Sequence, residues 1–264
     1  MKIAILGTNG FVGSNISSYL DINHTVTNVT REPIDLLNSI AVKQFLKENL
    51  FDVVINCAAV MTNNETLHDT HNNLGMFMNF YNNSNLFGKF INTGSGAEFD
   101  RTTDINNASE FEIFSHLPSD SYGFGQNIKS RLCFEKDNFY TIRIFNCFGQ
   151  REKETRLFPR LLSNQKITIH DRYFDYFSIS DLCTVVDHCI ENSWEDRDVN
   201  AVYTEKYKIS EIVEKFCNLQ NIEPNYTIIP SINNNYTGNG KKLQSMMLNL
   251  KGLSIGLKEY NKKE

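Results

Sequence analysis

The sequence predicts an α/β protein, with a Rossmann-type doubly wound parallel sheet followed by a small C-terminal lobe. Strand-like and helix-like segments alternate through the first two-thirds of its 264 residues, which is typical of a parallel sheet with crossover helices. The chain opens on an apolar run, residues 3–6, that breaks at once into spaced glycines. A hydrophobic share of 41% is enough for one sizeable core and a smaller appended lobe.

The expected elements alternate along the chain. Short apolar runs, many of them rich in β-branched or aromatic residues, indicate buried strands, and the longer stretches between them indicate helices. Strands are predicted at 3–6, 24–30, 51–59, 89–95 and 140–145, and helices at 11–20, 40–50, 70–83, 121–135 and 209–218. We expect a dinucleotide-binding domain over 1–165, rejoined by 175–203. A small substrate-binding lobe should follow over 204–264, with 150–174 contributing to it.

The glycine-rich turn after the first strand carries the strongest chemical signal. Gly7 permits a tight turn, Gly10 lets backbone N–H groups approach a pyrophosphate, and Gly13 packs the following helix against the sheet. That helix, Phe11 to Leu20, presents its positive end to the phosphate. The order of strand, turn and helix predicts dinucleotide binding, whereas a purely structural glycine turn is the alternative.

The charge balance excludes several other classes of protein. Net charge is −5 with an isoelectric point near 5.7, and there is no basic face for nucleic acid. The lysines at 241, 242, 262 and 263 are expected to be solvated surface. No apolar stretch approaches the length of a membrane span and no secretory leader precedes the first strand, so we expect a cytoplasmic protein.

Cysteines and histidines give no sign of a metal site. The six cysteines form no Cys-x-x-Cys pair and are expected to be buried in a reduced compartment. His68 and His71 lack a third ligand and are expected on an exposed helix face. Glu110 and Glu112 are expected in a polar loop without a chemical role.

Several motifs, taken together, resemble the extended short-chain dehydrogenase/reductase superfamily. They are Gly7-Thr-Asn-Gly-Phe-Val-Gly, Asn56-Cys-Ala-Ala, a serine ending the strand 89–95, and a tyrosine opening the helix 121–135. Within that superfamily the chain is most similar to the NAD(P)-dependent nucleotide-sugar epimerases, dehydratases and 4-ketoreductases. The resemblance covers nearly the whole chain and is weakest in its C-terminal part.

The resemblance implies roles for particular residues. The expected cofactor-binding residues are Gly7, Asn9, Gly10, Phe11, Val12, Gly13, Thr30, Arg31, Asp35, Ala58, Ala59, Asn73 and Phe145. The expected substrate-binding residues are Thr93, Asn146, Arg156, Arg160 and Tyr236, with Tyr236 in a segment that meets the nucleotide end of the substrate. Arg151 belongs to the same basic cluster, and a solvated surface is an equal alternative for each arginine.

The catalytic positions contain one departure from the family pattern. Ser95 would polarise the reacting carbonyl and Tyr122 would act as general acid or base; a simple turn and an aromatic helix start are the alternatives. The family motif Tyr-x-x-x-Lys here ends in Gln126, one helical turn from Tyr122. Glutamine can hydrogen-bond a ribose but brings no charge. Lys129, one turn further, would either be solvated or reach inward as a substitute.

Cofactor choice depends on the end of the second strand. An acidic residue there would bind the ribose 2′-OH of NAD, but the chain has Thr30 and Arg31, which suit a 2′-phosphate. The sequence therefore favours NADP, with NAD still possible. Asp35 would either approach the adenine or cap the next helix.

The sequence as a whole predicts an NADP(H)-dependent nucleotide-sugar oxidoreductase that reduces a keto sugar or epimerises it by redox chemistry. The alternative is an impaired or silent sugar-nucleotide-binding regulatory protein, because of Gln126. The expected partner is a nucleotide sugar, with no nucleic acid and no membrane. The resemblance also implies a homodimer built from the helices at 70–83 and 121–135. The identity of the sugar and of its base is left open.

Overall fold

A six-stranded parallel sheet forms the centre of the fold in the computed structural model, which describes residues 1–32, 34–60, 66–194, 197–229 and 234–260. Its strands are β1 (Lys2–Leu6), β2 (Thr25–Val29), β3 (Val53–Asn56), β4 (Lys89–Ser95), β6 (Phe139–Ile144) and β10 (Asp198–Ala201). Their order across the sheet is β10-β6-β4-β3-β1-β2. The predicted doubly wound α/β fold is confirmed. Because β2 and β3 lie on opposite sides of β1, the chain reverses its winding between β1 and β3, and ligands bind outside the carboxyl ends of such strands.

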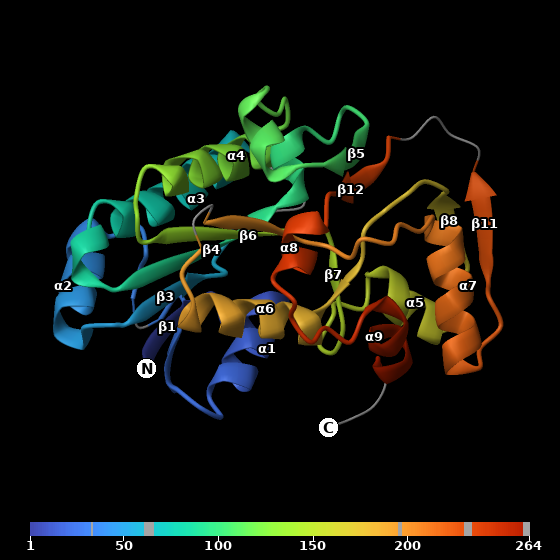
Figure 1. The fold of residues 1–264 in the computed structure, drawn as a ribbon, viewed down its shortest axis with the longest axis horizontal. Helices are drawn as coiled ribbons and strands as arrows, with labels where there is room; N and C mark the ends of the chain where they lie inside the picture. Colours follow the sequence, from blue (N-terminus) through green and yellow to red (C-terminus); the bar gives the residue numbers. More distant parts are fainter. Residues whose placement is uncertain (33, 61–65, 195–196, 230–233, 261–264) are drawn as a thin grey trace.

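Helices cover both faces of the sheet (Figure 1). On one face lie α1 (Phe11–Leu20) and α6 (Ile179–Glu191); on the other lie α2 (Ser39–Asn49), α3 (Leu67–Tyr81) and α4 (Ser121–Phe134). Alternation along β1 explains the two layers: Ile3 and Ile5 belong to the core beneath α1 and α6, whereas Ala4 and Leu6 belong to the opposite core. Each face of the sheet therefore has its own hydrophobic layer.

Element ends differ from the prediction where polar side chains decide them. Helix α3 begins at Leu67 rather than at Thr70, because Thr66 caps it in a reciprocal capping box with Asp69. Strand β3 ends at Asn56, three residues before the expected Ala59. The Asn56 amide donates to Asn92 Oδ1 and its Oδ1 accepts from Ala58 N, so its side chain fixes the turn that follows.

A second core lies beyond the carboxyl ends of the sheet strands. It is built around Phe158 and Phe216 from α5 (Leu157–Leu162), β8 (Ile167–His170), α7 (Ile209–Gln220), β11 (Tyr226–Ile229) and α9 (Leu253–Glu259). Part of the segment expected in the C-terminal lobe returns to the sheet instead, because α8 (Lys241–Ser245) packs on β10 and Leu243 joins the core beneath α6.

Short strand pairs and 3₁₀ helices connect the two parts. Strand β5 (Ile105–Ala108) pairs with β12 (Tyr236–Gly238), and β7 (Cys147–Phe148) pairs with β9 (Phe177–Ser178). The 3₁₀ helices are η1 (Ser84–Leu86), η2 (Gly96–Phe99) and η3 (Glu110–Phe114). In the part of the chain that the structure describes, no helix has the length and apolar character of a membrane span.

Candidate active site

A cavity of about 570 Å³ opens at the carboxyl ends of β1 and β3, where the winding of the sheet reverses. Its walls come from the turns after β1, β2 and β3 and from α3. It is lined by Gly7, Asn9, Gly10, Val29, Thr30, Arg31, Ile34, Asp35, Leu36, Leu37, Cys57, Ala58, Ala59, Val60, Asn72 and Met76. Eight of the expected cofactor-binding residues are in this lining: Gly7, Asn9, Gly10, Thr30, Arg31, Asp35, Ala58 and Ala59.

The three glycines of the first turn have different structural roles. Gly7 has φ +81°, and a Cβ there would lie 2.7 Å from the Ala58 Cα. A Cβ on Gly13 would lie 2.5 Å from the Gly7 carbonyl oxygen, so both positions exclude a side chain for reasons of packing. Gly10 differs, because its Cβ would meet only the Gly7 oxygen, at 3.3 Å. Its missing side chain leaves a cradle facing the cavity, as a phosphate group at the N-terminus of α1 requires.

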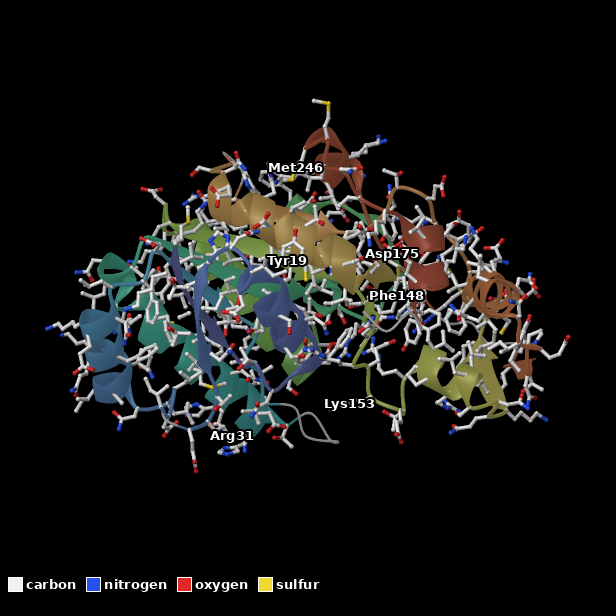
Figure 2. All side chains as sticks on the ribbon, turned by 90° about the horizontal axis from the view of Figure 1, so that it is seen from below. Tyr19, Arg31, Phe148, Lys153, Asp175 and Met246 are labelled. Atoms are coloured by element: carbon white, nitrogen blue, oxygen red, sulfur yellow. The ribbon has the colours of Figure 1, made fainter. Side chains whose placement is uncertain are left out.

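The rim of the cavity contains the residues expected to select the cofactor. Arg31 is exposed, and Figure 2 shows its side chain at the edge of the molecule, pointing away from the protein body. The Thr30 hydroxyl donates to the Glu32 carbonyl. Asp35 Oδ1 accepts from Leu37 N at 3.0 Å, while Asn38 is the residue that caps α2. Asp35 therefore orders the turn before α2 and also borders the cavity.

Other residues expected to bind the cofactor do not line the cavity. Asn73 exchanges two hydrogen bonds with the Val60 backbone, at 2.7 and 2.9 Å, and so holds the segment after β3 in place. Phe11 and Val12 pack against the core beneath α1. Phe145 does not line the cavity: it is 6% exposed and belongs to a separate core cluster, with its ring 5.1 Å from that of Tyr236.

The expected catalytic residues meet at the carboxyl end of β4. The Ser95 and Gln126 side chains lie near enough to the Tyr122 phenol for both to lower its pKa. Tyr236 also reaches Ser95, although it was expected at the nucleotide end of the substrate. Pairing of β12 with β5 brings Tyr236 to this position, where a Cβ on Gly96 would lie 2.8 Å from its hydroxyl.

Burial controls the acidity of this cluster. Burial raises the pKa of Tyr122 above its usual value, against the opposing effects of Ser95 and Gln126. Burial also raises the pKa of Tyr236 well above its usual value. Both phenols therefore hold their protons at neutral pH. The Oε1 atom of Gln126 is buried without a hydrogen-bond partner. It can accept a hydrogen bond from a ribose hydroxyl, so the cluster fits a bound dinucleotide.

Lys129 is not a solvated helix residue. It is 2% exposed, and burial lowers the pKa of its ammonium to about 8, opposed by the charge of Glu98. Cys133 is another neighbour of Lys129, and burial raises the pKa of its thiol to about 12, so the thiol is uncharged at neutral pH. Lys129 thus lies between α4 and the sheet.

A buried ionic network beneath Ser95 was not foreseen from the sequence. Glu98 accepts from Ser95 N at 2.7 Å and from Arg143 Nε at 2.6 Å, and both charged side chains are fully buried. Asp198 lies 3.5 Å from Arg143 Nη2 and binds Lys242 Nζ at 2.9 Å. Lys242 is therefore not solvated surface; Lys262 and Lys263 lie outside the described residues. The apolar periodicity of β6 gives no hint of an ion pair, although an arginine inside a buried strand is itself a signal.

Glu110 was expected in a polar loop and is instead 7% exposed in η3, where its carboxylate accepts from Asn200 N at 2.9 Å. Glu112 caps the same 3₁₀ helix through Ser109 N. Burial raises the pKa of Glu110, opposed by the bond from Asn200. Both acids therefore have structural contacts, which explains their presence in this segment.

The residues expected to bind substrate are spread over several places. Thr93 donates to the Asn56 carbonyl at 2.8 Å. Arg156 donates to Asn146 Oδ1 and, at 2.9 Å, to the Cys147 carbonyl, so these two expected residues contact each other. Arg160 is bound to Gln165 at 3.3 Å. Arg151, expected in the same basic cluster, instead contacts α1, where its guanidinium donates to the Ser18 hydroxyl at 3.0 Å.

The cysteines and histidines fit their expected structural roles. The six cysteines are free thiols, and all except Cys57 are buried. His68 and His71 are exposed on α3. Within the described ranges, no group of three or more candidate ligands could hold a metal ion.

Comparison with known proteins identifies the family. The model of the NAD dependent epimerase/dehydratase family matches residues 3–201. The chain belongs to this family. The NAD-dependent epimerase/dehydratase family predicted from the sequence is thereby confirmed. No curated protein matches the chain.

Solved structures share the fold over nearly the full length. A GDP-mannoheptose C4 reductase from Campylobacter jejuni, with NADP bound, has a TM-score of 0.83 at 21% identity, covering 99% of this chain and 98% of its own. A GDP-D-glycero-L-gluco-heptose synthase from the same organism, with NADPH, has a TM-score of 0.83 at 19% identity and the same coverage. A dTDP-glucose 4,6-dehydratase from Bacillus anthracis, with NAD, has a TM-score of 0.82 at 16% identity, covering 98% and 95%.

Proposed function

We propose that this protein is an NADP(H)-dependent oxidoreductase that reduces a keto group of a nucleotide sugar, or epimerises the sugar by redox chemistry. The observation that carries the proposal is the hydroxyl cluster of Ser95, Tyr122 and Tyr236. It lies beside the glycine-lined cavity, since Val60 both lines the cavity and borders a small recess next to Tyr122.

The chemistry follows from the state of the protons in this cluster. A bound nicotinamide supplies hydride to the keto carbon. Ser95 donates a hydrogen bond to the carbonyl oxygen and stabilises the negative charge that develops on it. Tyr122 then protonates that oxygen, and its raised pKa keeps the required proton in place at neutral pH. The arrangement therefore suits reduction better than oxidation.

The cofactor proposal is NADP rather than NAD. Arg31, at the rim beyond β2, offers a guanidinium to a 2′-phosphate, and no acidic residue directly ends that strand. Two of the similar structures named above contain NADP or NADPH and one contains NAD. The cradle at Gly10 would take the pyrophosphate.

The substrate proposal is a nucleotide sugar, as in the names of the similar enzymes. Arg156, just before α5, and Arg160, on that helix, are the proposed contacts of its diphosphate. Assembly as a homodimer through α3 and α4, which pack side by side, stays a prediction, as does location in the cytoplasm.

A catalytically silent sugar-nucleotide-binding protein is the second candidate, because Gln126 brings no charge to Tyr122. NADPH oxidation with a panel of 4-keto-6-deoxy sugar nucleotides tests the choice. Turnover that Tyr122→Phe abolishes supports the reductase. Binding of cofactor and sugar nucleotide without turnover supports the silent protein, and turnover that ignores Tyr122→Phe contradicts the assigned mechanism.

A further inference from the structure

A cation outside the family motif lies against the candidate general acid. The guanidinium carbon of Arg101 is 5.4 Å from the centre of the Tyr122 ring, at a distance typical of a cation–π contact. We propose that Arg101 supplies, through Tyr122, the positive charge that Gln126 does not provide. Arg101 is thus a positioning residue for the reaction, and the inference rests on the role of Tyr122 in the proposed function.

The backbone on both sides fixes Arg101 relative to Tyr122. The short helix η2 begins directly after Ser95 and ends at Phe99. Asp100, with φ +66°, then turns the chain, and Arg101 follows it. Arg101 Nη2 binds Asp120 Oδ1 at 2.6 Å. The same carboxylate accepts from Gly123 N at 2.7 Å and caps α4. One carboxylate therefore fixes both the guanidinium and the helical turn that carries the phenol.

Few charges act on Tyr122, and their signs are known. Glu98 raises the pKa of the phenol and Arg101 lowers it, while Ser95 and Gln126 lower it without carrying a charge. Tyr236, which faces the same cluster from β12, holds its proton at neutral pH. Asp120 offsets part of the Arg101 charge.

The N-terminus of α4 adds a partial positive charge at Tyr122. Lys129, a buried cation two turns further along α4, is under the charge of Glu98 and is not among the main groups that shift the pKa of Tyr122. Arg101 thus brings a full positive charge to the face of the Tyr122 ring.

This arrangement divides two tasks that a single lysine performs in the family motif. The unpartnered Oε1 of Gln126 is suited to accept from a ribose hydroxyl, a contact that an ammonium cannot make. Arg101 approaches from the face of the ring and leaves that position free. A guanidinium also stays charged at any pH at which the protein is folded.

The first test reads the ionisation of Tyr122 directly and needs no substrate. A fluorinated tyrosine placed at position 122 lowers the phenol pKa into a range where the protein stays folded, and ¹⁹F NMR then follows its titration. Arg101→Gln should raise this pKa by about one unit. Arg101→Lys keeps a charge near the ring and should raise it by less than half as much. Lys136→Gln, which removes a cation from the Tyr81 ring at the far end of α4, is the matched control.

Each NMR result decides the inference. An unchanged Tyr122 pKa in Arg101→Gln overturns it, whether or not the enzyme turns over. Equal shifts in Arg101→Gln and Arg101→Lys also overturn it, because lost packing rather than lost charge would then be the cause. The expected shift in a protein without turnover leaves the electrostatic role standing and contradicts only the proposed function.

The second test couples Arg101 to position 126 in an active enzyme. Arg101→Gln should lower kcat about tenfold at neutral pH. In the Gln126→Lys background the same substitution should lower kcat by less than about threefold, because the new ammonium already provides the charge. Equal losses in the two backgrounds would show that Arg101 acts independently of the missing lysine, which contradicts the inference.

Discussion

Restoring the family lysine by Gln126→Lys is the sharpest test of the catalytic assignment. A unit charge about 4 Å from the phenolate, at an effective dielectric constant of about 20, is worth about 4 kcal/mol. At about 1.4 kcal/mol per unit, that corresponds to roughly three pKa units on Tyr122. The new lysine should therefore stabilise the phenolate that forms when Tyr122 gives up its proton.

Burial limits this gain. Gln126 is 4% exposed, and Lys129, one turn along the same helix, shows what burial does there: its pKa falls to about 8. A lysine at position 126 should titrate in the same region, so that it is charged at pH 7 and neutral above about pH 9. General acid–base catalysis contributes about 10²–10⁴ in rate. We therefore expect kcat to rise at least about tenfold at pH 7 and the gain to disappear at alkaline pH.

Stopped-flow NADPH oxidation with 4-keto-6-deoxy sugar nucleotides measures this effect. Gln126→Met is the matched control, because it has similar volume without charge or hydrogen bonds, and it should not increase kcat. Tyr122→Phe in the Gln126→Lys background should remove the gain. The reasoning is refuted if kcat at pH 7 is unchanged, or if the gain survives Tyr122→Phe.

Three further predictions follow from the cavity and the core. Arg31→Ala should reduce the preference for NADPH over NADH by about tenfold or more while leaving NADH affinity nearly unchanged. Equal affinities of the unmutated protein for the two cofactors would contradict the role of Arg31. Gly10→Val should abolish cofactor binding in calorimetric titration. It should lower the melting temperature by no more than a few degrees, since Gly10 has φ −84° and a Cβ there meets only one backbone atom. Unchanged affinity in the folded variant would place the phosphate site elsewhere. Lys129→Met should raise the free energy of unfolding at pH 7 by up to about 3 kcal/mol. Burial lowers the pKa of Lys129 from 10.5 to about 8, so the unfolded state binds more protons than the folded state between these two pH values. The stability gained by Lys129→Met should therefore vanish near pH 11 in denaturant titrations. A stability gain independent of pH would show that the charge of Lys129 is not its cause.

Much of the fold could be predicted from the sequence because it depends on local patterns. Short apolar runs and spaced glycines determine buried strands and the turn after β1, and chain order then fixes a parallel sheet whose ligand site lies at its carboxyl ends. Most residues of the cavity wall, such as Gly10 and Arg31, follow from this order, because they lie at or soon after the ends of β1, β2 and β3, whereas Asn72 and Met76 lie on α3.

Tertiary structure decided what depends on contacts between distant segments. Tyr236 lies 141 positions after Ser95, and only the pairing of β12 with β5 brings it to that hydroxyl. The burial of Lys129 depends on how α4 packs on β6, and the charge of Arg101 reaches Tyr122 only because Asp120 holds both segments. The sequence by itself determined which groups are present and which strand ends carry them. Only the packed chain decided which of them are buried and which charges face one another, because desolvation and Coulomb interactions depend on distances in space and not on separation along the chain.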